Sequence, residues 1–319
     1  MPSRRDPIEE ALTELARVHA VASDDAAALL IDALAAQYPA VIARAAVLAG
    51  EMELRELEPD LVAAYDCLRQ DPEKLDPVCE AMKEVVATLF GFESNGPDVY
   101  LHAVRHVQPA GFDNQDVASP LRGLAIQALV NIERPEALTI ATDMLTDDED
   151  WARMGAAKAL RAIGSQAGAH VLRYKALTGD PSLEVMNECF AAMLEYSPSW
   201  VDAVAPYLLS SNDGVATMAA LAIAEARPYG ALSHLQQAWE EQRSPDTRDA
   251  VLQAIASLRS DEAVAYLISL VEGESMTAMQ ALTALTLYAA SESVVEQVRA
   301  AATANKRREV YAMFERLFG

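Results

Sequence analysis

The 319-residue chain carries 25 Lys and Arg against 48 Asp and Glu, which gives a formal net charge of −23. Nucleic acid and anionic membrane surfaces are disfavoured as partners because binding them requires clustered cations, so the acidity reflects either simple solubility or a basic protein partner. Hydrophobic residues form 52% of the chain and aromatic residues only 6%, a composition typical of alanine-rich helices.

The first 38 residues are predicted to form a helix pair. Apolar residues three and four positions apart share one face of a predicted helix over 6–22. Ser23 is the expected N-cap of a second helix over 24–38. The terminal units of a repeat protein are expected to be atypical in sequence, so residues 1–38 are assigned to an N-terminal capping pair.

Residues 39–107 are predicted to contain diverged helical repeats, because their period is looser than that of the chain downstream. The expected helix pairs are 39–50 with 59–70 and 76–92 with 98–107. Residues 108–116 then gather Pro, Gly, Asn and Asp and interrupt the apolar period. A segment of this kind is either functional or a tolerated insertion, and we favour a loop insertion between repeats.

One short pattern returns six times over residues 117–304. A small or apolar residue marks the copies at Ala125, Ala156, Cys189, Ala219, Val251 and Ala281, with steps of 31, 33, 30, 32 and 30 residues. A period in this range predicts stacked helical repeats, in which each unit buries its apolar face on its neighbours. We therefore expect six repeats and one continuous all-α solenoid.

Each copy is expected to contain an alanine-rich first helix, a short turn and a second helix. The second helices are predicted at 135–145, 166–177, 198–209, 229–241, 261–271 and 293–303. Residues 305–319 form a last helix with Lys306, Arg307 and Arg308 at its start, where the helix dipole disfavours cations. This segment either caps the last repeat, which we favour, or docks onto an acidic partner.

The first helices follow the pattern Arg-x-x-Ala-x-x-Ala-Leu after an Asp-rich turn. Its carriers are Arg122, Ala125, Ala128 and Leu129, and then Arg153, Ala156, Ala159 and Leu160. The later copies keep the small and apolar positions, and the Arg position survives as Arg248 but becomes Met186, Ala216 and Ala278 elsewhere. The unit resembles the HEAT repeat over residues 39–304, and most closely its short bacterial lyase-type form. That resemblance implies an α-α superhelix of antiparallel helix pairs.

The histidines and the acidic run offer little support for catalysis. His102 and His106 have the i and i+4 spacing of a metal-binding pair, but no third ligand is evident, so an exposed or hydrogen-bonded pair is favoured. HEAT-like di-iron hydroxylases carry His-Glu pairs, and here no His is followed by Glu. Residues 147–150 lack the central Gly of a calcium loop and are predicted to be an N-capping turn. We expect no catalytic residue, metal or cofactor.

The three cysteines, Cys67, Cys79 and Cys189, lack metal-ligand spacing and are predicted to be buried and reduced. The chain begins with charged residues followed by an amphipathic pattern, without the apolar core of an export signal. Both features favour a cytoplasmic location.

The concave face of the solenoid is expected to be lined by the second helices. These helices carry residues of the kinds that concentrate binding energy at interfaces: Tyr100, Arg105, Arg173, Tyr174, Tyr207, Gln236, Trp239 and Tyr266. A shift of one residue in register would instead place Tyr207 or Trp239 in the core.

We predict a non-enzymatic scaffold that binds a protein or peptide on its concave face. The alternative, implied only by the repeat subtype, is a lyase or lyase-chaperone subunit of the phycobilin-attachment type. A third class, HEAT-like DNA glycosylases, is opposed by the charge of −23.

Overall fold

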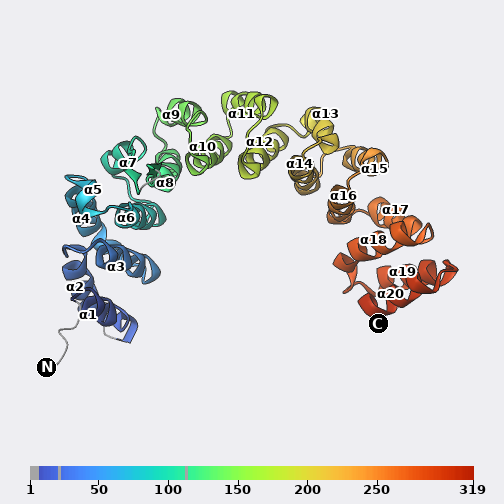
Figure 1. The fold of residues 1–319 in the computed structure, drawn as a ribbon, viewed down its shortest axis with the longest axis horizontal. Coiled ribbons are helices and arrows are strands. Elements are labelled where there is room, and N and C mark those ends of the chain that lie inside the picture. The colour runs from blue at the N-terminus through green and yellow to red at the C-terminus, as the bar shows by residue number, and fades with distance from the viewer. Residues whose placement is uncertain (1–6, 21–22, 112–113) are drawn as a thin grey trace. The chain divides into compact units, whose positions relative to one another are not determined.

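The computed structural model describes residues 7–20, 23–111 and 114–319. The chain forms two compact units, Met1–Ile163 (unit 1) and Gly164–Gly319 (unit 2), and each is described by itself. Apart from one short strand pair, the regular structure in the described ranges is helical (Figure 1). The predicted all-α fold of the α-α superhelix class is confirmed. None of the helices in these ranges has the length and apolarity needed to cross a bilayer.

Unit 1 contains ten α-helices in the part that the structure describes. They are α1 (Pro7–Leu15), α2 (Ser23–Leu34), α3 (Pro39–Glu51), α4 (Glu58–Leu68), α5 (Pro72–Leu75), α6 (Glu80–Gly91), α7 (Pro97–Ala103), α8 (Ser119–Asn131), α9 (Ala137–Met144) and α10 (Asp150–Ile163). The strands β1 (Pro109–Ala110) and β2 (Gln115–Asp116) lie between α7 and α8. Proline stands at the first or second position of several of these helices, where its missing N–H costs nothing.

Several helix boundaries in unit 1 differ from the prediction: the helix expected to end at residue 38 ends at Leu34, and the one expected to end at residue 107 ends at Ala103. The first helix ends at Leu15, and a 3-10 turn over Val18–Ala20 follows, so that both Leu15 and Val18 are buried. Part of the predicted helix, residues 6, 21 and 22, lies outside the described residues, as does the side chain of Ser23. The helix expected from Asp76 begins instead at Glu80, because the buried Asp76 carboxylate accepts hydrogen bonds from the N–H groups of Glu80 and Met82.

Unit 2 continues with α11 (Gln166–Thr178), α12 (Leu183–Tyr196), α13 (Val201–Val204), α14 (Asp213–Ala226), α15 (Ala231–Glu241), α16 (Pro245–Ser257), α17 (Asp261–Val271), α18 (Ser275–Leu285), α19 (Glu292–Ala304) and α20 (Arg308–Phe318). The helix predicted over 198–209 is broken into a 3-10 turn, α13 and a second 3-10 turn. Pro206 lies inside that segment, and a proline removes a helical hydrogen bond and clashes with the preceding turn.

Polar side chains fix where the helices of unit 2 begin. The N-cap residues whose side chains accept a hydrogen bond from the first turn are Ser165, Ser182, Asn212, Ser244 and Ser260. Each cap satisfies a backbone donor that a helix leaves unpaired at its start. The regular return of these caps explains why turns recur at the repeat period.

The first helices of successive pairs pack directly against each other. In unit 1 the row is α3, α6, α8 and α10, and in unit 2 it is α12, α14, α16, α18 and α20. All six marker positions of the repeat are fully buried in these rows. Successive second helices touch one another far less. The alanine-rich first helices therefore form the packing seam of each unit, as small side chains allow helices to approach closely.

The closest approach in this seam is between α8 and α10. A Cβ atom added to Gly155 would lie 2.6 Å from the carbonyl oxygen of Gly123, and one added to Gly123 would lie 2.7 Å from the carbonyl oxygen of Trp151. These obstacles are backbone atoms, which cannot rotate away. Only glycine fits at either position.

Arginines of the repeat pattern form hydrogen bonds to the turns between successive helix pairs. Arg122 is 4% exposed and donates from Nε and Nη2 to the carboxylate of Asp147 at 3.0 and 2.9 Å. Its Nη1 donates to the carbonyl of His106 at 2.9 Å and pairs with the carboxylate of Asp116. In the next copy, Arg153 donates to the backbone carbonyls of residues 147 and 148.

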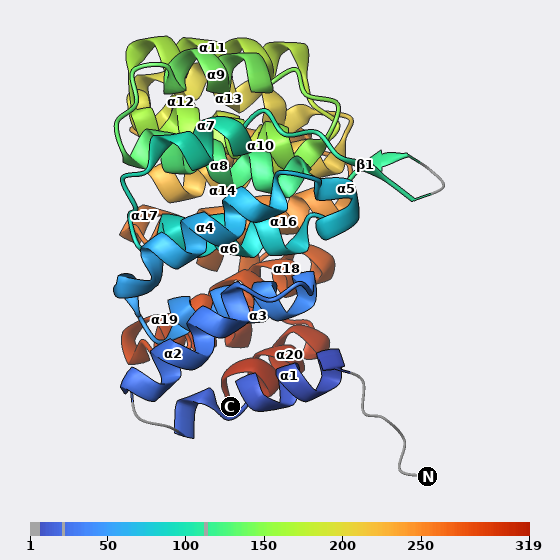
Figure 2. The same ribbon diagram turned by 90° about the vertical axis from the view of Figure 1, so that its left-hand side faces the viewer.

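The segment predicted as a loop insertion forms a β-hairpin. Pro109 pairs with Asp116 and Ala110 with Gln115 in an antiparallel register, and the hairpin stands out from the helices of unit 1 (Figure 2). Residues 112 and 113 lie outside the described residues. At the base, Asp116 accepts hydrogen bonds from the N–H groups of Gln108 and Ala118. The hairpin is thus tied to α8 through Arg122.

We expect Gly155→Ala to destabilise the protein by about 1–3 kcal/mol or more, because the new methyl group overpacks the α8–α10 crossing. The matched control is Gly91→Ala at the exposed end of α6, where an added Cβ meets nothing within 4 Å. That change should be neutral or slightly stabilising. Urea unfolding checks both variants, and equal stabilities would contradict the assigned crossing.

We expect Arg122→Met to cost about 3–5 kcal/mol at pH 7, because it leaves two partly buried carboxylates without their cation. Burial alone would raise the pKa of Asp116, but its two N–H donors and Arg122 hold that pKa below the ordinary value. The stabilisation from Asp116 is therefore complete above the unfolded-state pKa and lost as pH falls through the folded-state pKa. The cost of Arg122→Met should shrink in acid.

The control for this variant is Arg134→Ala, which breaks a half-exposed ion pair with Glu136 and should cost less than about 1 kcal/mol. Chemical unfolding measured at neutral and acidic pH tests the difference. A cost for Arg122→Met that does not vary with pH would rule out the charged network as its cause.

Candidate partner-binding site

The two helix rows take different sides of each unit. Within unit 1 and within unit 2, the first helices lie on the inner side of the curve and the second helices on the outer side (Figure 1). Our assignment of the second helices to the concave face is therefore wrong. The physical reason is the seam: the row with the smaller side chains packs at the shorter spacing, and the shorter row lies inside a curve.

Two of the eight predicted contact residues belong to the core. Tyr100 is 1% exposed, and burial raises the pKa of its hydroxyl to about 12. Trp239 is 8% exposed, and its ring packs against the guanidinium of Arg248, with 4.3 Å from Cζ to the ring centroid. The prediction that these two side chains are available to a partner is wrong, because the register of their helices turns them inward.

Four more predicted residues are dispersed. Tyr207 is half-buried against Phe190, with ring centroids 4.8 Å apart. Tyr266 and Gln236 are also half-buried, and burial followed by the charge of Glu240 raises the pKa of Tyr266. Arg105 is exposed and donates to a carbonyl of its own helix at 3.2 Å. Among the described residues these four make no hydrogen bond, ion pair or ring contact with one another, and their role in binding stays a prediction.

The remaining two, Arg173 and Tyr174, lie on an exposed stripe of α11. His170, Tyr174 and Leu177 stand three and four residues apart, so they share one helix face. Tyr174 is 69% exposed and Leu177 is 68% exposed. Apolar side chains of this size are rarely left so open at adjacent positions of a helix.

Aromatic side chains from the following elements join this stripe. The ring of His170 meets that of Trp200 edge-on at 5.1 Å, and Tyr196 lies 5.3 Å from Trp200. Arg173 places its guanidinium carbon 5.5 Å from the Trp200 ring. We call the set His170, Arg173, Tyr174, Leu177, Tyr196 and Trp200 the outer patch.

Sequence reasoning found only two members of the outer patch. Tyr196 and Trp200 frame Pro198, and an aromatic pair around a turn proline was the available signal. The exposure of Leu177 could not be derived from the repeat pattern. Whether an apolar residue at a helix end is buried depends on which other elements pack against it, and the pattern of one helix does not contain that information.

The inner side of unit 2 offers a second surface. A groove of about 310 Å³ lies over α16, α18 and α20, with Met279 and Met313 among its lining residues. Gln280 donates to Asp249 across it at 2.6 Å. Arg316 also lines the groove, so its charge is mixed. Flexible methionines suit a surface that adapts to its ligand.

The histidine pair is hydrogen-bonded, as favoured. His102 Nδ1 is 2.9 Å from the hydroxyl of Tyr65, and His106 Nε2 is 2.9 Å from the amide oxygen of Gln108. Burial, then the neighbouring His106 and Arg69, lowers the pKa of His102. Within the described ranges no three His, Cys, Asp or Glu side chains are grouped so as to hold a metal ion.

The cysteines differ in their surroundings. Cys79 and Cys189 are buried, and burial raises the pKa of each thiol to about 12, which keeps both protonated. Cys67 is exposed on α4, so the prediction that all three are buried is wrong for this residue. An exposed residue at this position departs from the apolar pattern from which burial was inferred.

Comparison with known proteins identifies the repeat. A family model for HEAT repeats matches residues 110–193. A search of curated proteins found no match.

Three solved structures match the chain at low identity. The complex of CpcE and CpcF of phycocyanin lyase from Nostoc sp. PCC7120 is 16% identical, covers 74% of this chain and 89% of its own, and gives a TM-score of 0.37. An engineered protein is 17% identical over 99% of this chain and 95% of its own, with a TM-score of 0.39. Human deoxyhypusine hydroxylase in complex with glycerol is 20% identical over 84% and 97%, with a TM-score of 0.32.

The family match falls on the segment where the arginine pattern is clearest, from the hairpin through α12. Its helix pairs are the same stacked units that recur before and after it in the chain. Residues 110–193 of this chain are HEAT repeats.

Proposed function

We propose that the chain is a non-catalytic scaffold that binds a protein or peptide partner, and that the outer patch of unit 2 is its main contact. The single observation that carries this proposal is the exposed pair Tyr174 and Leu177, on the face of α11 that also carries His170, whose ring meets that of Trp200. Trp, Tyr and Arg are the residues that concentrate binding energy when a partner excludes water from them.

The packing of unit 2 gives no reason for this cluster to be open. Leu172 and Ala176 on the other face of α11 are buried and hold the helix in place. The stripe of Tyr174 and Leu177 adds nothing to that packing, so its apolar area is available to a partner at about 25 cal/mol per Å² buried.

The patch is also partly preorganised. The Trp200 ring contacts both His170 and Arg173, so it loses little freedom on binding. Among the described residues, Arg173 has no acceptor for its N–H groups. These donors can therefore bind a carbonyl or carboxylate of the partner. A peptide segment with an apolar anchor and an acceptor group one turn away fits this arrangement.

The rest of the molecule's charge supports the wider proposal. A net charge of −23 favours a partner with basic residues around its anchor and disfavours nucleic acid and anionic membranes. The free cysteines support a location in the bacterial cytoplasm.

The lyase-subunit function remains the alternative, and it rests on the repeat subtype alone. Mixing the purified chain with a free phycobilin separates the two proposals. A shift in visible absorbance on mixing would favour the lyase role, and an unchanged spectrum would favour the scaffold.

We expect Tyr174→Ala combined with Leu177→Ala to weaken partner binding by about 2 kcal/mol or more, roughly thirtyfold, because both anchors lose their contact area. Crosslinked affinity purification from the native host identifies the partner, and titration calorimetry with that partner measures the loss. The folded state should be unaffected, since both side chains are exposed.

Two controls accompany this experiment. Tyr229→Ala removes a fully exposed tyrosine from the turn before α15 and should leave affinity unchanged. Trp239→Ala empties a core position and should lower the free energy of unfolding by about 3–5 kcal/mol. Unchanged affinity in the double variant, or an equal loss with Tyr229→Ala, would reject the outer patch as the contact.

A further inference from the structure

Residues 7–38 and residues 305–319 carry opposite net charge. Residues 7–38 contain six acidic residues and one arginine, a balance of −5. Residues 305–319 contain four basic and two acidic residues, a balance of +2, in a chain that is acidic elsewhere. The basic residues are concentrated at Lys306, Arg307 and Arg308, at the start of α20.

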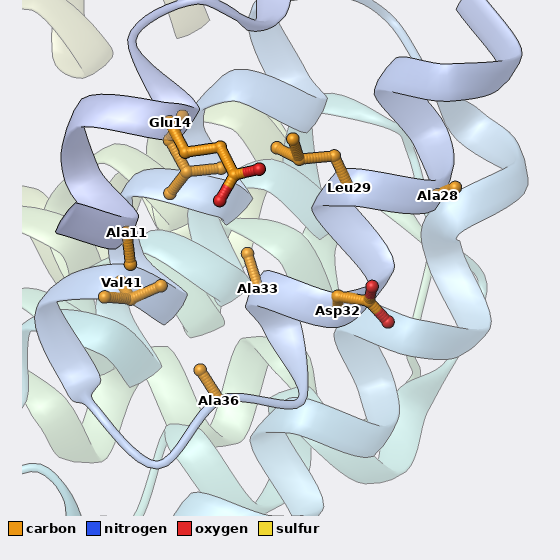
Figure 3. Close-up of a pocket in the computed structure, with 9 residues that line it drawn as sticks. Ala11, Glu14, Ala28, Leu29, Asp32, Ala33, Ala36 and Val41 are labelled. Atoms are coloured by element: carbon orange, nitrogen blue, oxygen red, sulfur yellow. The ribbon is translucent and has the colours of Figure 1, made fainter. Parts of the chain in front are cut away.

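The acidic segment contains an apolar groove. A hollow of about 390 Å³ lies between α1 and α2, and its size falls in the range of binding pockets. Its lining includes the small side chains of Ala11, Ala33 and Ala36. Glu14 from α1 and Asp32 from α2 flank the alanines and are both exposed (Figure 3). We call this hollow the N-terminal groove.

The basic segment presents a helix edge. Val310 and Phe314 are fully buried and pack α20 onto α18 and α19. The opposite face keeps Arg308, Tyr311 and Ala312 exposed, beside a second hollow of about 480 Å³. We call the exposed set Lys306, Arg308, Tyr311 and Ala312 the C-terminal edge.

Part of this edge makes no contribution to the packing of unit 2. Arg307 donates to the carbonyl of Gly273 at 2.8 Å and so belongs to the packing of unit 2. Lys306 and Arg308 form no ion pair with any side chain in the ranges that the structure describes. Their charges are therefore free to meet carboxylates from outside.

We propose that the C-terminal edge of one copy docks into the N-terminal groove of a second copy. The alanines of the groove let the exposed face of α20 approach closely, and Tyr311 supplies the apolar side chain that enters it. Lys306 and Arg308 then pair with Glu14 and Asp32, which matches opposite charges at the rim of the contact.

This contact joins two different surfaces, so each added copy leaves one groove and one edge open. Such a heterologous contact produces chains of copies that extend head to tail unless the rotation closes a ring. The net charge of −23 on each copy opposes association, but salt at physiological strength screens charges beyond about 8 Å and leaves the touching pairs effective. The outer patch takes no part, so this inference is independent of the proposed partner binding.

Sedimentation velocity over a wide range of protein concentration tests the proposal with two variants of the full chain. One carries Glu14→Lys and Asp32→Lys, and the other carries Lys306→Glu and Arg308→Glu. The wild-type chain is expected to form species larger than a dimer as concentration rises. Each variant alone should be monomeric, with a dissociation constant raised by at least about tenfold, because like charges then meet at the contact.

The decisive sample is the mixture of the two variants. The first retains an intact C-terminal edge and the second an intact N-terminal groove, so together they should form a one-to-one dimer that cannot grow. Because that dimer requires both variants to be folded, unfolding cannot imitate the result. A chain with all four reversals should regain self-association through the exchanged charges.

The matched control for the groove variant is Glu73→Lys with Glu225→Lys, which changes the net charge in the same direction and by the same amount at two exposed acids away from both surfaces. It should associate like the wild type. A wild-type chain that stays monomeric at every concentration overturns the proposal and leaves the groove to a basic helix of another protein. A monomeric mixture, or reversed variants that associate like the control, also overturns it.

Discussion

The architecture depends on the close approach of the first helices. Where α8 crosses α10, the two backbones meet at Gly123 and Gly155, and in unit 2 the fully buried Ala219 and Ala281 keep their helices close in the same way. Such packing accommodates only the smallest side chains, because a single methyl group added at the Gly123–Gly155 crossing would clash with backbone atoms. The row that packs most closely becomes the inner row, and this determines which side chains each unit presents on its outer side.

The buried arginines extend this seam into the turns. Arg122 connects the hairpin base to the turn after α9 through Asp116 and Asp147, so three segments that differ in sequence become one polar network. A buried charge is tolerated only where several acceptors surround it. The network therefore fixes the spacing of neighbouring pairs where apolar contacts alone would leave it loose. Gln108, which reaches from the hairpin to the carbonyl of Asp76, adds a further tie.

The sequence was sufficient to predict the fold class, because the period of the buried markers is a direct imprint of stacking. It was insufficient for several features of the structure. Pro206 breaks a predicted second helix, and Asp76 moves a helix start by capping it. The side of the curve depends on which row packs more closely, and that follows from backbone contacts in space. The exposure of Leu177, and the burial of Trp239, depend on neighbouring elements that a single helical pattern does not contain.

The central claim is that packing and binding are carried by different residues: the first helices maintain the stack, and the outer patch on α11 and its neighbours binds the partner. The most direct test is a saturation scan of single substitutions that measures the cellular abundance and the partner binding of each variant separately. Substitutions at the six buried markers should lower abundance, whereas those at Tyr174, Leu177 and Trp200 should lower binding at normal abundance. A scan in which the binding-specific positions fell on the inner methionines, Met279 and Met313, would contradict the account.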